Sequence, residues 1–121
     1  MILGKQADIL ETFENPRSDR GYSIRFSYSE FTSLCPLTGQ PDFGAIDVHY
    51  VPGSRCVELK SLKLYFASYR SEGAFFEEVT NRILDDLLSV CDPVEMTVTG
   101  KFNKRGGMDH EIIAKHPQGG N

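Results

Sequence analysis

Hydrophobic and polar residues alternate along three stretches of the chain, which are residues 21–34, 45–51 and 94–102. In the first stretch, aromatic or aliphatic residues occupy every second position from Tyr22 to Tyr28. A period of two predicts a half-buried β-strand in each stretch. The phase slips near Phe31, which predicts a bulge or the end of the first strand. A turn is predicted at residues 103–107, and one more short strand is predicted over residues 110–116.

Between the second and third strands the hydrophobic period becomes that of a helix. From Leu59 to Tyr69, apolar residues recur at intervals of three and four positions. The strongest helix is predicted over residues 74–91, where one face carries Phe76, Val79, Ile83, Leu87 and Val90. Glu77 and Glu78 lie in its first turn, where the helix dipole favours anions. Pro93 ends it.

These elements predict one α+β domain over residues 1–121, in the order β-β-α-α-β-β. The sheet is expected to be antiparallel, with two helices inserted between its hairpins. Prolines and glycines mark residues 35–44 as the loop between the first two strands. Residues 1–19 are expected to form an extended arm, and residues 117–121 a frayed tail.

Composition narrows the classes of protein further. The chain has 121 residues with 13 basic and 17 acidic side chains, and its net charge of -4 disfavours direct binding of nucleic acid. No apolar run is long enough to span a membrane. Three cysteines without a CxxC pair argue against a disulfide framework or a zinc ribbon, and predict a reducing cytoplasm. The absence of GxGxxG argues against the usual dinucleotide-binding fold.

Cys35 and Asp42 are the first candidates for chemistry. They flank a chain reversal that contains Pro36, Gly39 and Pro41, so their side chains are able to face one cavity. A thiol near the surface can act as a nucleophile, and a carboxyl beside it can give or take a proton. A buried structural cysteine and a turn-forming aspartate are the alternative interpretation.

Three further side chains are candidates for binding. Lys60 and Lys63 share one predicted helical face and could hold a phosphate, or simply form a solvated basic face. Glu77 could accept two N–H groups from a guanine-like ring, or cap its own helix. The three histidines have no metal-ligand spacing, so no metal site is predicted, and His49 is expected to be packed or at an interface.

Two long motifs resemble one known family. Residues 58–65, Glu-Leu-Lys-Ser-Leu-Lys-Leu-Tyr, look like the signature of the QueF family, the NADPH-dependent nitrile reductases of queuosine biosynthesis, a tRNA modification. Residues 31–43, Phe-Thr-Ser-Leu-Cys-Pro-Leu-Thr-Gly-Gln-Pro-Asp-Phe, are similar to the catalytic loop of that family. The likeness continues through residues 68–70 and 75–87, and it covers the chain from about residue 10 to about residue 115.

The resemblance implies a tunnelling fold (T-fold), in which antiparallel strands carry two helices on one face and subunits assemble into rings. It implies a homo-oligomer, a decamer of two pentamers, with sites at the subunit interfaces. The implied reaction reduces 7-cyano-7-deazaguanine (preQ0) to the 7-aminomethyl compound (preQ1) with two equivalents of NADPH. The chain corresponds to the short, single-domain form of the family.

Roles carry over residue by residue. Cys35 matches the nucleophile that forms a covalent thioimide with the nitrile, and Asp42 matches the proton donor. Glu77 matches the carboxylate that anchors the deazaguanine ring. The segment lining the substrate pocket corresponds to Val57, Glu58 and Leu59, and the motif associated with NADPH contains Lys60 and Lys63.

One position departs from the family pattern. Some members carry a histidine directly before the anchoring glutamate, and this chain has Phe76 there. Phe76 carries no proton for a relay of the kind that this histidine could provide, while its ring is still able to wall the substrate pocket.

Three other functions remain open from the sequence. A QueF-like amidinotransferase acting on preQ0 in tRNA would share Cys35 and Asp42 without needing the NADPH motif. A zinc-dependent cyclohydrolase on the same fold would need metal ligands. A non-catalytic purine- or pterin-binding module would bind through Glu77 and form no adduct. Because a chain of this length is short for enclosing two ligands, we also expect its active site to lie between subunits.

Overall fold

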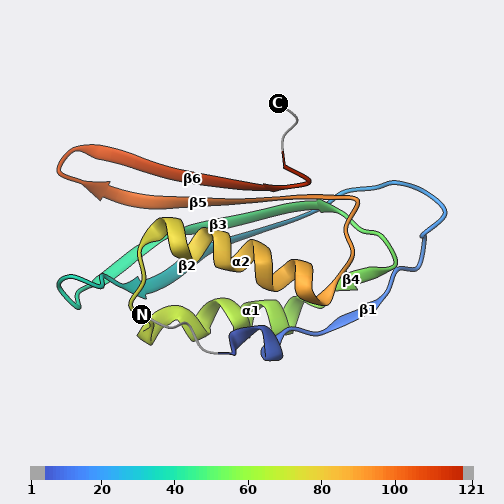
Figure 1. The fold of residues 1–121 in the computed structure, drawn as a ribbon, viewed down its shortest axis with the longest axis horizontal. Helices are drawn as coiled ribbons and strands as arrows, with labels where there is room; N and C mark the ends of the chain where they lie inside the picture. Colours follow the sequence, from blue (N-terminus) through green and yellow to red (C-terminus); the bar gives the residue numbers. More distant parts are fainter. Residues whose placement is uncertain (1–4, 119–121) are drawn as a thin grey trace.

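The computed structural model of the chain describes residues 5–118, except for the side chains of residues 104 and 105. Its main sheet is antiparallel and has the order β2-β3-β5-β6. The four strands are β2 (Ile24–Leu34), β3 (Pro41–Val51), β5 (Glu95–Arg105) and β6 (Met108–His116). Both helices, α1 (Leu59–Ala67) and α2 (Phe76–Val90), lie on one side of this sheet (Figure 1). The expected α+β class with an antiparallel sheet and two helices is confirmed.

Short elements appear that the sequence pattern did not predict. The 3-10 helix η1 (Gln6–Ile9) and strand β1 (Thr12–Glu14) occupy part of the segment expected to be an extended arm. Strand β1 pairs with β4 (Arg55–Val57) in a second, two-stranded sheet. A second 3-10 helix, η2 (Ser68–Ser71), follows α1. Residues 1–4, and residues 119–121 of the predicted tail, lie outside the described residues.

The first hairpin is tighter than its composition predicts. Strand β3 begins at Pro41 rather than after residue 44, because Leu34 pairs with Pro41 and Ser33 with Asp42. Proline is tolerated at the first residue of a strand, so composition alone was a poor guide to this boundary. The expected phase slip near Phe31 is confirmed as an irregularity between Tyr28 and Phe31.

The core lies between the sheet and the helices. Ile46 and Val48 of β3 and Val79 and Ile83 of α2 are each at most 1% exposed. Burial of side chains of this size contributes about 1.5–3 kcal/mol each. Gly100 lets α2 approach β5 closely, since a Cβ added there would lie 2.7 Å from the Thr80 hydroxyl oxygen.

A buried polar network joins the two helices. The Tyr65 hydroxyl of α1 donates to a carboxylate oxygen of Asp86 in α2 at 2.6 Å, and it lies 2.8 Å from the Tyr69 hydroxyl. The other Asp86 oxygen lies 3.2 Å from Nε of Arg82. Because every member has a partner, this network fixes the helix pair without leaving a buried charge unpaired. Neither described helix has the length and apolar character needed to cross a lipid bilayer.

Candidate active site

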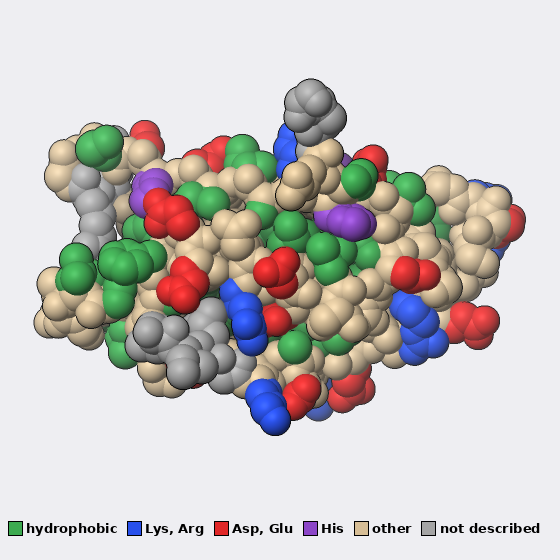
Figure 2. All heavy atoms as spheres, viewed as in Figure 1, with side chains coloured by type: hydrophobic (Ala, Val, Ile, Leu, Met, Phe, Trp, Pro, Cys, Tyr) green, Lys and Arg blue, Asp and Glu red, His purple; other side chains and the backbone are tan. Residues whose placement is uncertain are grey.

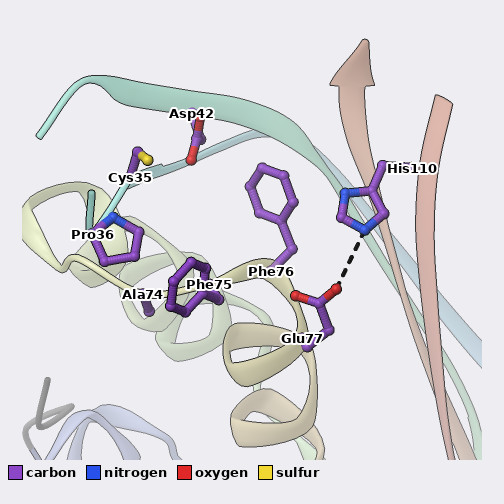
Figure 3. A pocket seen from close by; sticks show the side chains of 8 residues that line it. All are labelled: Cys35, Pro36, Asp42, Ala74, Phe75, Phe76, Glu77 and His110. Carbon is purple, nitrogen blue, oxygen red and sulfur yellow. Dashed lines mark ion pairs between the residues drawn. The ribbon is translucent and has the colours of Figure 1, made fainter. Parts of the chain in front are cut away.

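A pocket of about 350 Å³ opens at the end of the molecule where α2 begins. Its lining comes from the loop after β2, the start of β3, the entry to α2, and β6 (Figure 3). The lining residues are Cys35, Pro36, Asp42, Ala74, Phe75, Phe76, Glu77 and His110. The pocket thus joins mostly apolar walls to a thiol, two carboxyl groups and an imidazole.

Backbone pairing holds the loop that carries Cys35 against the segment that leads into α2. Leu34 and Gly73 form an isolated parallel bridge. The Leu34 N–H donates to the Glu72 carbonyl at 2.9 Å, and the Ala74 N–H donates to the Leu34 carbonyl at 3.1 Å. Residues 35 and 75–77 are therefore neighbours, although about forty positions separate them in the sequence.

The loop itself is closed by the backbone of Cys35. The Cys35 N–H donates to the Gln40 carbonyl, and the Gly39 N–H donates to the Cys35 carbonyl, both at 2.8 Å. Gly39 has a φ of 74°, a conformation that glycine adopts readily and other residues rarely. The position of the Cys35 backbone is consequently fixed by hydrogen bonds within the loop.

Asp42 lies in strand β3 rather than in the turn, and its residue is 6% exposed. In the sheet it pairs with Ser33, which is fully buried. Figure 3 shows the Asp42 carboxyl and the Cys35 thiol on the same wall of the pocket. The structure therefore brings together the two groups that the chain reversal was expected to place in one cavity.

Phe76 and Glu77 begin α2 on the facing wall. The Phe76 ring stacks on Phe102 of β5 with centroids 3.9 Å apart and planes 8° from parallel. Helix α2 has no side-chain hydrogen bond at its N-cap, Phe75. A carboxylate oxygen of Glu77 instead lies 3.5 Å from Nε2 of His110. The Glu77 carboxylate thus lies beside His110 in the lining of the pocket.

His110 belongs to the pocket, and the sequence reasoning missed it. Gly106 and Gly107 both have positive φ, as a tight two-residue hairpin turn requires. A regular hairpin from this turn would place His110 opposite Asn103, on the other face of the sheet. The register shifts between Phe102 and Arg105, so His110 pairs with Phe102 instead. Only this one-residue slip turns the imidazole toward the pocket.

The other predicted site residues lie outside this pocket. Val57 is 3% exposed in β4, and its N–H donates to the Tyr50 hydroxyl at 2.9 Å. Leu59 and Lys63 line a separate groove of about 290 Å³ between α1 and β2, and Lys60 is exposed on α1. Helix α1 begins beside β4, at the end of the molecule away from the start of α2 (Figure 1). Within one chain, the predicted site residues therefore lie in two separate regions, the pocket at the start of α2 and the region around the start of α1.

Glu58 has a structural role that the motif did not predict. Its two carboxylate oxygens accept the N–H groups of Lys60 and Ser61, both at 2.7 Å, and so cap the N-terminus of α1. These backbone hydrogen bonds hold the pKa of Glu58 below its usual range. Both oxygens are engaged at the helix end in this chain.

Cys56 and Cys91 are buried, as expected for structural thiols. The Cys91 thiol donates to the Leu87 carbonyl at 3.2 Å, and burial raises its pKa to about 11. A thiol with such a pKa is a poor nucleophile near neutral pH. Among residues 5–118, no three histidine, cysteine, aspartate or glutamate side chains gather in a way that would hold a metal ion.

Comparisons with known proteins point to one family. Residues 41–120 match the family model described as QueF-like protein. The chain is 57% identical over 111 residues to the NADPH-dependent 7-cyano-7-deazaguanine reductase of Nitrosococcus oceani, covering 92% of this chain and 86% of that protein. It is 54% identical over 109 residues to the protein of the same name from Chlorobium phaeovibrioides, covering 90% of this chain and 94% of the relative.

A solved structure supports the fold. The archaeosine synthase QueF-Like in its apo form superposes with a TM-score of 0.69 at 22% identity, over 78% of this chain and 91% of the other. At that identity the likeness concerns the fold alone. The sequence relatives and the family model carry the assignment, and by them the chain belongs to the QueF family.

Proposed function

We propose that the chain is an NADPH-dependent reductase that converts 7-cyano-7-deazaguanine to 7-aminomethyl-7-deazaguanine, a step toward queuosine in tRNA. The observation that carries the proposal is the pocket in which Cys35, Asp42 and Glu77 meet. Relatives with more than half of their aligned residues identical bear the name of this reductase. The proposal extends their named activity to this chain.

Cys35 acts as the nucleophile in this proposal. A nitrile carbon is a weak electrophile, so the thiolate adds to it first and forms a C–S bond. The electron pair of the C≡N bond moves to nitrogen, which takes up a proton. The product is a thioimide on Cys35, whose C=N bond accepts hydride more readily than the nitrile does.

Asp42 supplies the proton in the addition step. The residue is 6% exposed and lines the same pocket as the thiol. A carboxyl group in the same cavity is able to give a proton to the nitrogen as the thiolate adds to the nitrile carbon. After the first hydride addition the C–S bond would break, which would restore the Cys35 thiolate, return one proton and leave an imine for the second hydride. Each hydride addition would require one proton at nitrogen, which gives Asp42 a repeated role as acid.

Glu77 anchors the base. A carboxylate accepts two N–H groups, and a deazaguanine ring presents a ring N–H beside an exocyclic amine. Phe75 and Phe76 flank Glu77 in the lining and offer apolar and aromatic surface to a planar ring. The ring, the nitrile and the thiol would then lie in one cavity of this chain.

The lysines of α1 suit the cofactor. Lys60 and Lys63 are exposed, and Lys63 borders the groove between α1 and β2. Ammonium groups of this kind bind phosphates as point charges, so these two residues would hold the phosphates of NADPH. When bound, NADPH supplies the hydride, and two equivalents convert the nitrile to the amine.

The separation of the two residue groups supports an active site shared between subunits. Strands β2 and β6 are the outer strands of the main sheet, and outer strands are able to pair with a neighbouring chain. The pocket end also exposes hydrophobic side chains, seen at the left of Figure 2, and Leu37, Phe43 and Phe75 are each more than half exposed. The resemblance to the QueF family implies a decamer of two pentamers, and with it we propose a T-fold ring that joins the pocket of one chain to α1 of another.

Loss of NADPH absorbance on addition of 7-cyano-7-deazaguanine tests the proposed function. We expect consumption of two NADPH per nitrile for the wild type and none for Cys35→Ala, while Cys91→Ala keeps the activity. A normal rate for Cys35→Ala would contradict the covalent mechanism. A covalent adduct without NADPH oxidation would instead favour transfer of ammonia, and binding without an adduct would favour a non-catalytic module.

A further inference from the structure

The His110 imidazole stands at the rim of the pocket, beside the carboxylate proposed to hold the substrate. Its Nε2 lies 3.5 Å from Oε2 of Glu77. In Figure 3 this oxygen faces the imidazole, while the other oxygen of Glu77 turns toward the pocket. Each carboxylate oxygen has two lone pairs, so Oε2 is able to hold His110 and still accept from a ligand.

The imidazole is itself held in place by two rings. The Phe76 centroid lies 5.1 Å from that of His110, with the planes 64° apart. The Phe102 centroid is 6.1 Å from that of His110. Since Phe76 and Phe102 stack on each other, a packed aromatic pair from α2 and β5 sets the orientation of His110.

The contact between His110 and Glu77 contributes little to folding. Its side chains are 41% and 66% exposed, and ion pairs at such exposure have little effect on stability. Glu77 lies in the first turn of α2, where its side chain is otherwise free to adopt several rotamers. The imidazole on β6, packed against Phe76 and Phe102, reduces this freedom before a ligand arrives.

We propose that His110 is a positioning residue for substrate binding, which fixes the Glu77 carboxylate in the orientation that receives the N–H edge of the base. The inference rests on the proposed function of Glu77. It predicts an effect on the KM of the nucleobase, because preorganisation lowers the cost of binding. It predicts little effect on kcat, because the bond-making groups are Cys35 and Asp42.

Three variants separate the polar contact between His110 and Glu77 from the role of His110 as a packed ring. His110→Phe keeps the aromatic contact with Phe76 and Phe102 but loses the N–H, so we expect KM for 7-cyano-7-deazaguanine to rise about three- to tenfold. His110→Ala should show at least the same rise. His110→Gln supplies an amide N–H near the position of Nε2 and should restore most of the affinity. His116→Ala is the matched control, because it lies on the same strand roughly 20 Å away.

Binding to the Cys35→Ala chain keeps this test apart from the test of catalysis. Calorimetric titration of 7-cyano-7-deazaguanine into that chain should give a Kd that rises about three- to tenfold when His110→Phe is added. This result supports the inference even if the wild type oxidises no NADPH. The inference would be overturned if His110→Phe left Kd or KM unchanged, or if His110→Gln failed to restore affinity. It would also be overturned if the base did not bind at all.

Discussion

Glu77 and Glu78 are adjacent, exposed carboxylates in the first turn of α2, and only Glu77 lines the pocket. We expect Glu77→Gln to lower kcat/KM for the nitrile base about ten- to a hundredfold, because an amide accepts only one of two N–H groups and carries no charge. Steady-state kinetics with varied nitrile base measures the effect. Glu78→Gln is the control, since it makes the same change of charge one position along the helix. Equal losses in both variants would show that helix electrostatics, and not ligand contact, carry the effect.

At the scale of single residues, sequence reasoning predicted site residues that the structure places in the lining of one pocket. Cys35 and Asp42 flank one short reversal, and Glu77 opens a strongly periodic helix. His110 was not predicted as a pocket residue, because the face of the sheet on which its side chain lies depends on a register shift between β5 and β6. No local sequence pattern encodes that shift.

At the scale of elements, the negative charge of the Glu58 carboxylate stabilises the N-terminus of α1. Its pKa is lowered in the folded chain, so its stabilising effect is complete above the unfolded pKa of about 4.3 and is lost as pH falls through the folded value. Glu58→Gln should therefore lower Tm at pH 7 and have a smaller effect near pH 3. Thermal unfolding by circular dichroism measures both values, with the exposed Glu95→Gln as control. A Tm difference that is the same at both pH values would contradict capping by the carboxylate.

Gly100 sets the distance between α2 and β5. A Cβ there would meet the Thr80 hydroxyl and the Phe102 ring, both at 2.7 Å, so Gly100→Ala should destabilise the chain by about 1–3 kcal/mol. Chemical denaturation measures the change in free energy of unfolding. Gly21→Ala is the control, because nothing lies within 4 Å of a Cβ added at Gly21. Equal stability of the two variants would show that α2 moves away from the sheet without cost.

The four strands of the main sheet and the two helices packed on it were predictable, because each has a clear hydrophobic period and is bounded by turn residues. The boundary of β3 was not, since prolines and glycines at residues 36–44 look like a loop while the backbone already pairs. The small β1–β4 sheet was also missed. Each of its strands has only three residues, too few to show a period.

At the scale of the whole molecule, the two predicted ligand regions do not meet within one chain. If the active site is shared, Cys35→Ala and a Lys60→Ala, Lys63→Ala double variant should complement each other. Co-expression with two affinity tags, followed by purification of mixed oligomers, should recover roughly a quarter of wild-type activity, because some sites receive an intact half from each chain. Activity no higher than that of the separate variants would contradict a shared site, as would an active monomer in light scattering.

The central claim is that the Cys35 thiol bonds covalently to the nitrile carbon. Intact-mass spectrometry of the chain mixed with 7-cyano-7-deazaguanine, without NADPH, tests it most directly. We predict that the wild type and Cys91→Ala gain the mass of one nitrile base, and that Cys35→Ala gains nothing. A wild-type chain of unchanged mass, or an adduct that persists in Cys35→Ala, would contradict the account.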